Sequence, residues 1–249
     1  MTQRQKTIQN EVSLSGIGLH TGNPVTVRFK PAAQETGIRF IRVDLPGSPV
    51  IEARAVNVRT EARIPRCTSI GKGDAVIYTV EHLMSALCGL GIDNIDVEIN
   101  SDELPGLDGS AIGFLQLLKE AGIVEQEFKR RYFDIKEPMG VTEGESSIFI
   151  VPAADLRISY TLDYDHPYLR SQFISTTVHA DIFEREIAPC RTFCLEDETV
   201  SLREKGLGKG ANYENTLVVG PGGVKGIRFA FRMNLPGIRS LILLAIFIY

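Results

Sequence analysis

Apolar and polar residues alternate in short stretches along the first half of the chain, and Gly, Pro or Asn bound each stretch. The clearest cases are PVTVRFKP at residues 24–31 and GIRFIRVDL at residues 37–45, followed later by NIDVEIN at residues 94–100. A period of two is typical of strands that bury one face. The pattern therefore predicts a sheet in this part of the protein.

Two segments of the first half have helical spacing instead. In TVEHLMSALCGLG, residues 79–91, the apolar side chains recur every three or four positions, Thr79 is available as the N-cap, and glycines follow the last turn. A second helix is predicted for SAIGFLQLLKEAGI, residues 110–123, with Ser110 as its cap and an end near Gly122. Helices and strands therefore occur in the same region.

The strand pattern restarts after the charged stretch EQEFKRRYF, so we predict a domain boundary near residue 128. Further strands are expected in FDIKEPMGV, SSIFIVPA, LRISYTLDY and NTLVVG, and a short helix in DETVSLREKGLG. The fold class that follows is α+β, with two similar layered domains of sheet and helix at residues 1–128 and 129–249. The second domain is expected to be incomplete and aberrant from about residue 230.

Composition and charge argue against several classes of protein, among them nucleic-acid-binding and secreted proteins. The chain has 249 residues, 43% of them apolar, which is enough to build a core, and its net charge of -4 argues against nucleic acid as the main partner. Four scattered cysteines favour a reducing compartment. The N-terminus has no secretory apolar stretch, and the final LILLAIFIY is too short to span a bilayer. We expect a cytoplasmic protein without a transmembrane segment.

Glu81 and His82 are the first candidates for chemistry, because both lie in the first turn of the predicted helix at residues 79–91. The helix dipole disfavours an imidazolium there, so it keeps the ring of His82 neutral and able to bind a metal ion. The alternative is an ordinary polar residue in a first turn. The pair alone leaves both interpretations open.

Four motifs occur in an order and spacing that resemble one enzyme family: GIGLHTG at residues 16–22, TVEHLMSALCGLGIDN at 79–94, LPGLDGSA at 104–111 and PCRTF at 189–193. The chain resembles the zinc-dependent UDP-3-O-acyl-N-acetylglucosamine deacetylases of lipid A biosynthesis from about residue 5 to about residue 229. The resemblance implies a cytoplasmic enzyme of two similar domains that uses Zn2+ to hydrolyse the acetyl amide of that nucleotide sugar. We expect a monomer.

The resemblance also implies roles for single residues. His82 matches the first zinc ligand, Glu81 matches the general base that acts on metal-bound water, and Thr192 matches the hydroxyl that holds the oxyanion. Phe193, in an insert near residues 166–200 that forms the passage for the acyl chain, is expected at the site. His20 and Asp108 are candidates for contact with substrate, although a role in a tight turn is the alternative for both.

The chain departs from the family where the remaining ligands should lie. A catalytic zinc site uses three protein ligands, but the histidines are only His20, His82, His166 and His179, and none follows residue 179. The family's His-Lys-x-x-Asp motif and a later catalytic His belong after the segment PGGVKGIRF and are absent, and neither His166 nor His179 matches a ligand position. We therefore expect an enzyme that is inactive as its sequence stands; the alternative is a non-catalytic member that only binds the nucleotide sugar or a partner.

The residues from Arg232 onward suggest how the motif was lost. With codons that the genetic code permits, a second reading frame through Arg232–Tyr249 begins with Asp-Glu-Phe-Ala-Arg-His-Lys-Ile-Leu-Asp, which contains the family's His-Lys and Asp in order. A shifted frame also accounts for an apolar tail that has neither strand alternation nor helical amphipathicity. The hypothesis is a frameshift, and the codons of the gene test it.

Overall fold

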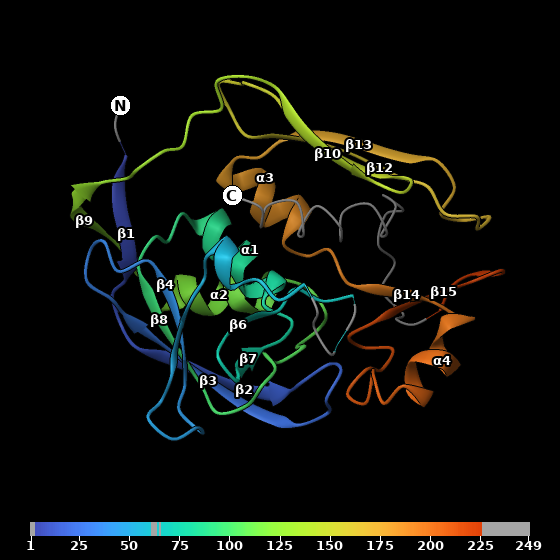
Figure 1. The fold of residues 1–249 in the computed structure, drawn as a ribbon, viewed down its shortest axis with the longest axis horizontal. Coiled ribbons are helices and arrows are strands. Elements are labelled where there is room, and N and C mark those ends of the chain that lie inside the picture. The colour runs from blue at the N-terminus through green and yellow to red at the C-terminus, as the bar shows by residue number, and fades with distance from the viewer. Residues whose placement is uncertain (1–2, 61–63, 65, 226–249) are drawn as a thin grey trace.

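The computed structural model describes residues 3–60, 64 and 66–225 (Figure 1). The tail that we expect to be aberrant from about residue 230, and the segment with the proposed second reading frame, lie outside these residues. Within the described part, helices and strands alternate along the chain and pack in layers, which confirms the predicted α+β class.

A five-stranded sheet forms the base of the first half. Its order is β2 (Val12–Ile17), β3 (Pro24–Pro31), β8 (Ile95–Ile99), β4 (Ile38–Arg42) and β5 (Val50–Glu52). Strand β3 is antiparallel to both of its neighbours, whereas β4 is parallel to β8 and therefore needs a long crossover between them. The crossover contains the first helix.

The strands predicted from alternation are confirmed. In β3 the side chains of Val25, Val27 and Phe29 are buried while the residues between them are exposed, as a period of two requires. Phe29 lies opposite Val97 of β8 and meets Phe114 edge to face, with ring centroids 6.5 Å apart. One face of the sheet is therefore packed against a helix.

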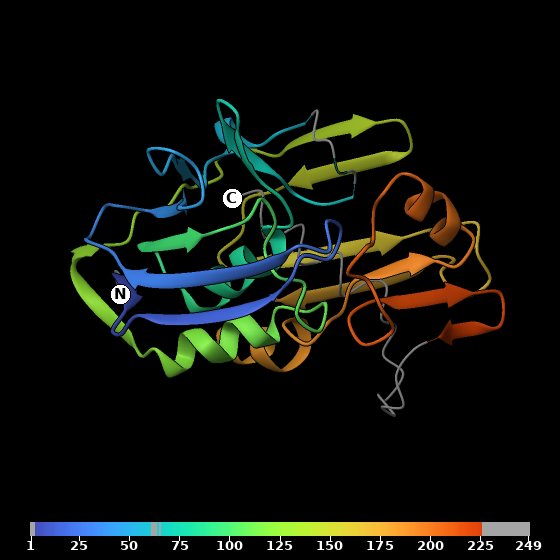
Figure 2. The same cartoon turned by 90° about the horizontal axis from the view of Figure 1, so that it is seen from below.

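Helices α1 (Glu81–Leu90) and α2 (Ile112–Glu120) pack against each other and lie between the five-stranded sheet and a hairpin of the second half (Figures 1 and 2). Helix α1 ends at Gly91, which has a φ of 68° and closes the last turn through its N–H. Both predicted helices are thus present, and the end of the second near Gly122 is confirmed by the turn from Gly122 N–H to Lys119 O.

Both predicted N-caps are wrong. The cap of α1 is Val80, because the hydroxyl of Thr79 donates to a carboxylate of Glu103 instead of to the helix. The cap of α2 is Ala111; Ser110 precedes it, and its hydroxyl accepts from the N–H of Ile112 at 3.2 Å while donating to Asp108. For Thr79 a tertiary contact takes the hydroxyl away from the cap, whereas the Ser110 hydroxyl still binds the N–H of Ile112 and donates its own proton to Asp108 nearby in the chain.

The remaining elements of the first half are small. Strand β1 (Arg4–Ile8) pairs with β9 (Ile123–Lys129), so the chain returns to its start before it enters the second half. Strands β6 (Ile70–Lys72) and β7 (Ala75–Ile77) form a hairpin just before α1, and a short helix η1 (Ala55–Asn57) precedes them. Strand β9 extends through residue 128; the division of the chain there stays a prediction.

The second half consists of short elements in small sheets. Its elements are β10 (Met139–Glu143), β11 (Ser146–Ile150), β12 (Arg157–Leu162), β13 (Gln172–Thr177), α3 (Ala180–Ile182), η2 (Phe183–Ile187), β14 (Phe193–Leu195), α4 (Glu198–Glu204), β15 (Leu217–Gly220) and β16 (Gly223–Lys225). Strands β10–β11 and β12–β13 form separate hairpins, and β14, β15 and β16 form a three-stranded sheet. The strands predicted in SSIFIVPA, LRISYTLDY and NTLVVG and the short helix in DETVSLREKGLG are present, whereas the strand expected in FDIKEPMGV begins only at Met139. Strands β13, β14 and β16 and the helical turns at residues 180–187 were not predicted.

The main hydrophobic core crosses from one half to the other. It contains the buried residues of the sheet, of α1 and of α2, and it continues into the second half through Ile158, Phe183, Ile187 and Ala188. A second, small cluster surrounds Leu162, Leu169 and Val219. Helix α1 is consequently covered by both halves.

Within the described residues, no helix is both long enough and apolar enough to cross a membrane.

Candidate active site at the start of helix α1

Glu81 begins helix α1 with a buried side chain, of which 7% is exposed. One carboxylate oxygen accepts a hydrogen bond from the N–H of Thr68 at 3.0 Å. Burial raises the pKa of Glu81 to about 7, and the nearby charge of Glu103 adds to the rise. A carboxyl group with such a pKa can both accept and release a proton near neutral pH.

His82 follows directly and is equally buried. Its Nδ1 has no hydrogen-bond partner among the residues that the structure describes. Burial lowers the pKa of His82 to about 4, although the negative charge of Asp108 acts in the opposite direction. The ring is therefore neutral at physiological pH, with a buried polar atom free for a contact that the described protein does not supply.

The loop around Asp108 faces the second half. Asp108 holds a tight turn, in which one carboxylate oxygen accepts from the N–H and the hydroxyl of Ser110 at 3.0 and 2.8 Å. The N–H of Thr192 donates to Gly109 O at 2.8 Å, and the Arg191 guanidinium donates to Asp108 O at 2.6 Å. The PCRTF segment is thereby fixed on the loop whose charge reaches His82.

Gly109 makes this approach of two segments sterically feasible. Its φ is 81°, and a Cβ atom built on it would lie 1.8 Å from the carbonyl oxygen of Asn215. No side chain fits there without moving the backbone. The glycine of the LPGLDGSA motif is thus needed for contact with the second half as well as for the turn.

Glu103 connects this site to the loop at His20, and sequence reasoning missed it. The fully buried carboxylate accepts hydrogen bonds from four groups: the N–H of His20, the N–H and hydroxyl of Thr21, and the hydroxyl of Thr79, at distances of 2.7 to 3.1 Å. Thr79 has a φ of 60°, which is unfavourable for a β-branched residue. Its bond to Glu103 holds the strained residue that leads into α1.

The sequence does carry a weak signal for Glu103. Gly18 approaches it so closely that a Cβ atom would lie 2.4 Å from a carboxylate oxygen. A glycine-rich stretch such as GIGLHTG can therefore indicate close packing as well as a turn. Glu103, however, is more than 80 residues away in the sequence, and no local pattern predicts that it lies here.

A catalytic zinc ion needs more ligands than the described residues bring together. Such a site takes three protein ligands, but the described residues contain no group of three His, Cys, Asp or Glu side chains placed to hold a metal ion. His82, with its unpartnered Nδ1, is the one predicted ligand among them. The described residues alone therefore do not complete a zinc site.

The family model for UDP-3-O-acyl N-acetylglycosamine deacetylase matches residues 5–231. The chain belongs to this family. Among relatives, a UDP-3-O-acyl-N-acetylglucosamine deacetylase of Bdellovibrio bacteriovorus is 40% identical over 215 residues, which are 86% of this chain and 70% of that protein. A protein of the same name from Citrifermentans bemidjiense is 40% identical over 90% of this chain and 74% of its own length. A bifunctional LpxC/FabZ enzyme of Chlorobaculum tepidum is 41% identical over 88% of this chain and 47% of its own length.

The structure brings most of the predicted site residues of this deacetylase family into one region. Glu81, His82, Asp108 and Thr192 come together through the contacts described above, and His20 is joined to them through Glu103. Phe193 follows Thr192 in β14 and packs in the second cluster, with its ring edge to face with Tyr164 at 6.2 Å. The roles assigned to these residues stay predictions.

Proposed function

We propose that the chain carries the catalytic apparatus of a deacetylase that hydrolyses the acetyl amide of UDP-3-O-acyl-N-acetylglucosamine in lipid A biosynthesis. Membership of the family supports this proposal, because the relatives with that name are matched over 86–90% of this chain. The observation that carries it is the buried Glu81–His82 pair at the start of α1, next to the loops of Asp108 and Thr192. Cytoplasmic location and a monomeric state remain part of the proposal.

In this proposal Glu81 takes the proton from the attacking water. Its pKa of about 7 matches that task, since a general base is most effective when its pKa lies near the working pH. The same carboxyl group can then pass the proton to the leaving amine. The Thr68 N–H that binds it fixes the orientation of its oxygens.

Thr192 is proposed to stabilise the oxyanion through its hydroxyl, an interaction that is typically worth about 3 kcal/mol of barrier. Its backbone is anchored on Gly109, which supports a fixed position for the side chain. Phe193, His20 and Asp108 are proposed to contact substrate, with Phe193 at the acyl passage. When bound, Zn2+ would polarise the carbonyl group of the substrate and lower the pKa of a water molecule. His82 is the proposed ligand on this chain.

We further propose that the chain binds zinc weakly and is inactive as its sequence stands. The support is that His82 matches a predicted ligand, whereas His166 and His179 match no ligand position of the family. A non-catalytic member that only binds the nucleotide sugar is the second candidate, and the same observation favours it.

Elemental analysis of the purified protein, combined with a deacetylation assay, tests these proposals. We expect much less than one zinc per chain and no turnover. Stoichiometric zinc with turnover that is lost in His82→Ala would contradict the inactivity and confirm the site. Binding of the nucleotide sugar without turnover would favour the second candidate, whereas no binding at all would contradict both.

A further inference from the structure

Strands β11 and β12 follow each other in the chain, and each has one edge without a strand partner among the described residues. Strand β11 pairs with β10 and β12 pairs with β13, so the two hairpins are separate two-stranded sheets. They lie together on the side of the helices away from the five-stranded sheet, and the arrows of β11 and β12 point in opposite directions (Figures 1 and 2). The N–H and C=O groups along a free strand edge can bind a further strand.

The five-stranded sheet of the first half shows what two such edges can accommodate. Its order is β2, β3, β8, β4 and β5, so β8 lies between β3 and β4, which follow each other in the chain. Strand β8 is antiparallel to β3 and parallel to β4. Strands β3 and β4 therefore point in opposite directions, as β11 and β12 do, and each is paired on its other side with the strand next to it in the sequence.

The connecting segments agree with this comparison. Residues 32–37 join β3 to β4 and lead the chain past β8, and residues 151–156, a segment of the same length, join β11 to β12. Neighbouring strands lie about 4.8 Å apart, so a connection between the strands on either side of a third has to span about 10 Å. An extended chain covers this distance in about three residues. The connection therefore permits one strand between β11 and β12.

The hairpin of β10 and β11 also has an apolar face that the described residues leave uncovered. Val141 lies opposite Ile148, and Met139 lies opposite Ile150, so these four side chains share one face of the hairpin. Three of them are at least 48% exposed, and Ile150 is half-buried. A contiguous exposed apolar face is a common feature of interaction sites.

Strand β8 indicates the chemistry of a suitable partner. Its residues Ile95, Val97 and Ile99 are fully buried, whereas the two acidic residues between them are only partly buried. A strand in the middle of a sheet that is packed on one face needs this alternation. The partner of β11 and β12, which have five and six residues, is therefore an extended segment of similar length with an apolar residue at every second position.

We propose that the edges of β11 and β12 form a slot for one strand, antiparallel to β11 and parallel to β12, which a second polypeptide supplies. The relatives indicate its source. The Bdellovibrio and Citrifermentans proteins are matched over 70% and 74% of their own length, so each has a further segment outside the alignment with this chain. The occupant is a polypeptide with the sequence of such a segment, bound through its backbone and its alternate apolar side chains.

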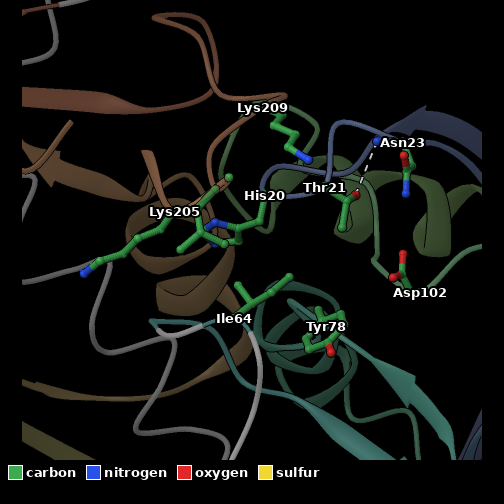
Figure 3. Close-up of a pocket in the computed structure, with 10 residues that line it drawn as sticks. His20, Thr21, Asn23, Ile64, Tyr78, Asp102, Lys205 and Lys209 are labelled. Carbon is green, nitrogen blue, oxygen red and sulfur yellow. Dashed lines mark hydrogen bonds between the residues drawn. The ribbon is translucent and has the colours of Figure 1, made fainter. Parts of the chain in front are cut away.

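The slot is distinct from the candidate active site and goes beyond the proposed deacetylation. None of the residues that line the cavity beside His20 belongs to strands β10–β13 (Figure 3). Glu81, His82 and Asp108 also lie in other elements. Deacetylation is therefore not a measure of this binding.

Sedimentation and hydrogen exchange of the full chain, with and without a probe polypeptide, test the proposal. The probe is the part of the Bdellovibrio bacteriovorus relative outside the segment that this chain matches, produced separately. We expect saturable binding of one probe per chain. With the probe at about ten times its Kd, only about a tenth of the chains have a free slot, so exchange of the edge amides of β11 and β12 should slow about tenfold. The amides of β3 and β4, which are paired on both sides, should not change.

Two variants of β11 test whether the probe lies against its apolar face. Ile148→Asp places a charge on that face and should weaken binding about tenfold, because apolar cross-strand contacts with the added strand are lost. Ser147→Asp is the matched control, since it adds the same charge at an exposed position on the opposite face of the same strand. It should weaken binding by less than about threefold. Both positions are exposed, and circular dichroism checks that both variants fold.

The proposal is overturned if the probe does not bind saturably, if it slows exchange only outside β11 and β12, or if the two variants bind it equally well. It is also overturned if the chain alone protects the edge amides of β11 and β12 as well as those of β3. A dimer in sedimentation would then assign the slot to a second copy of the chain, and a monomer would assign it to another segment of the same chain.

Discussion

The first 129 residues and the rest of the described chain use the same kinds of element but bury them differently. Strands β3 and β8 place every second side chain in the main core. In the β10–β11 hairpin nine of the ten strand residues are exposed and the tenth, Ile150, is half-buried. A strand pattern alone therefore does not tell how much a strand contributes to stability, since that depends on what covers it.

The contrast extends to the apolar side chains. Met139, Val141, Ile148, Phe149 and Val151 are all exposed, although residues of this kind form the core in the first half. A two-stranded hairpin gains little stability by itself. The candidate active site lies where the well-packed first half meets the second, so its geometry depends on contacts from both.

The largest expected effect is the difference in stability lost when a buried ring of the first half and an exposed ring of the second half are each replaced by alanine. Phe29→Ala removes a fully buried ring that packs on Phe114, and it should lower the free energy of unfolding by about 4 kcal/mol. Phe149→Ala, at a ring that is 71% exposed in β11, should change it by less than about 0.5 kcal/mol. Urea unfolding followed by circular dichroism measures both. Equal losses would mean that the hairpin is packed in solution.

Gly109→Ala tests whether the two halves are joined as described. The new Cβ would meet Asn215 O at 1.8 Å, and the positive φ adds strain, so we expect a loss of about 3 kcal/mol. Gly37→Ala is the matched control, because Gly37 has a similar φ of 74° but nothing within 4 Å of the added atom. It should lose only about 1 kcal/mol. A small loss for Gly109→Ala would show that the segment around Asn215 does not lie on the loop.

The smallest expected effect concerns a buried acid of the first half. The pKa of Glu81 is raised from 4.5 to about 7 in the folded protein, so its folded form holds a proton more tightly. The stability that the folded state gains from this tighter proton binding is fully present below pH 4.5 and is lost as the pH rises through 7. The raised pKa alone corresponds to a change of up to about 3 kcal/mol in the free energy of unfolding over this pH range. Because the structure around the charged form relaxes, we expect Glu81→Gln to remove about 2 kcal/mol of it.

Unfolding of Glu81→Gln and of the parent chain at pH 5 and pH 8 measures this difference. Glu143→Gln, at an exposed position of β10, controls for the removal of one negative charge. The explanation fails if the parent chain and Glu81→Gln lose the same stability between the two pH values.

The sequence by itself determined the elements with clear periodicity. Strands β3, β4 and β8 follow their alternation, and α1 and α2 follow their apolar spacing, because burying one face of a regular element requires that pattern whatever the neighbours are. The motifs also identified the family, which the family model confirms over residues 5–231. Their place at a helix start made Glu81 and His82 candidates, and the resemblance of the motifs to the family then gave them their predicted roles.

Only the tertiary structure decided which polar side chain serves which partner. The hydroxyl of Thr79 binds Glu103, which is 24 positions away in the sequence, instead of capping α1. Glu103 also binds the His20 loop, which is more than 80 positions away. Hydrogen-bond partners of this kind depend on where the sheet places the loops, and the residues that meet share no local pattern. The pKa values of Glu81 and His82 likewise follow from burial by both halves, which no single segment of the sequence contains.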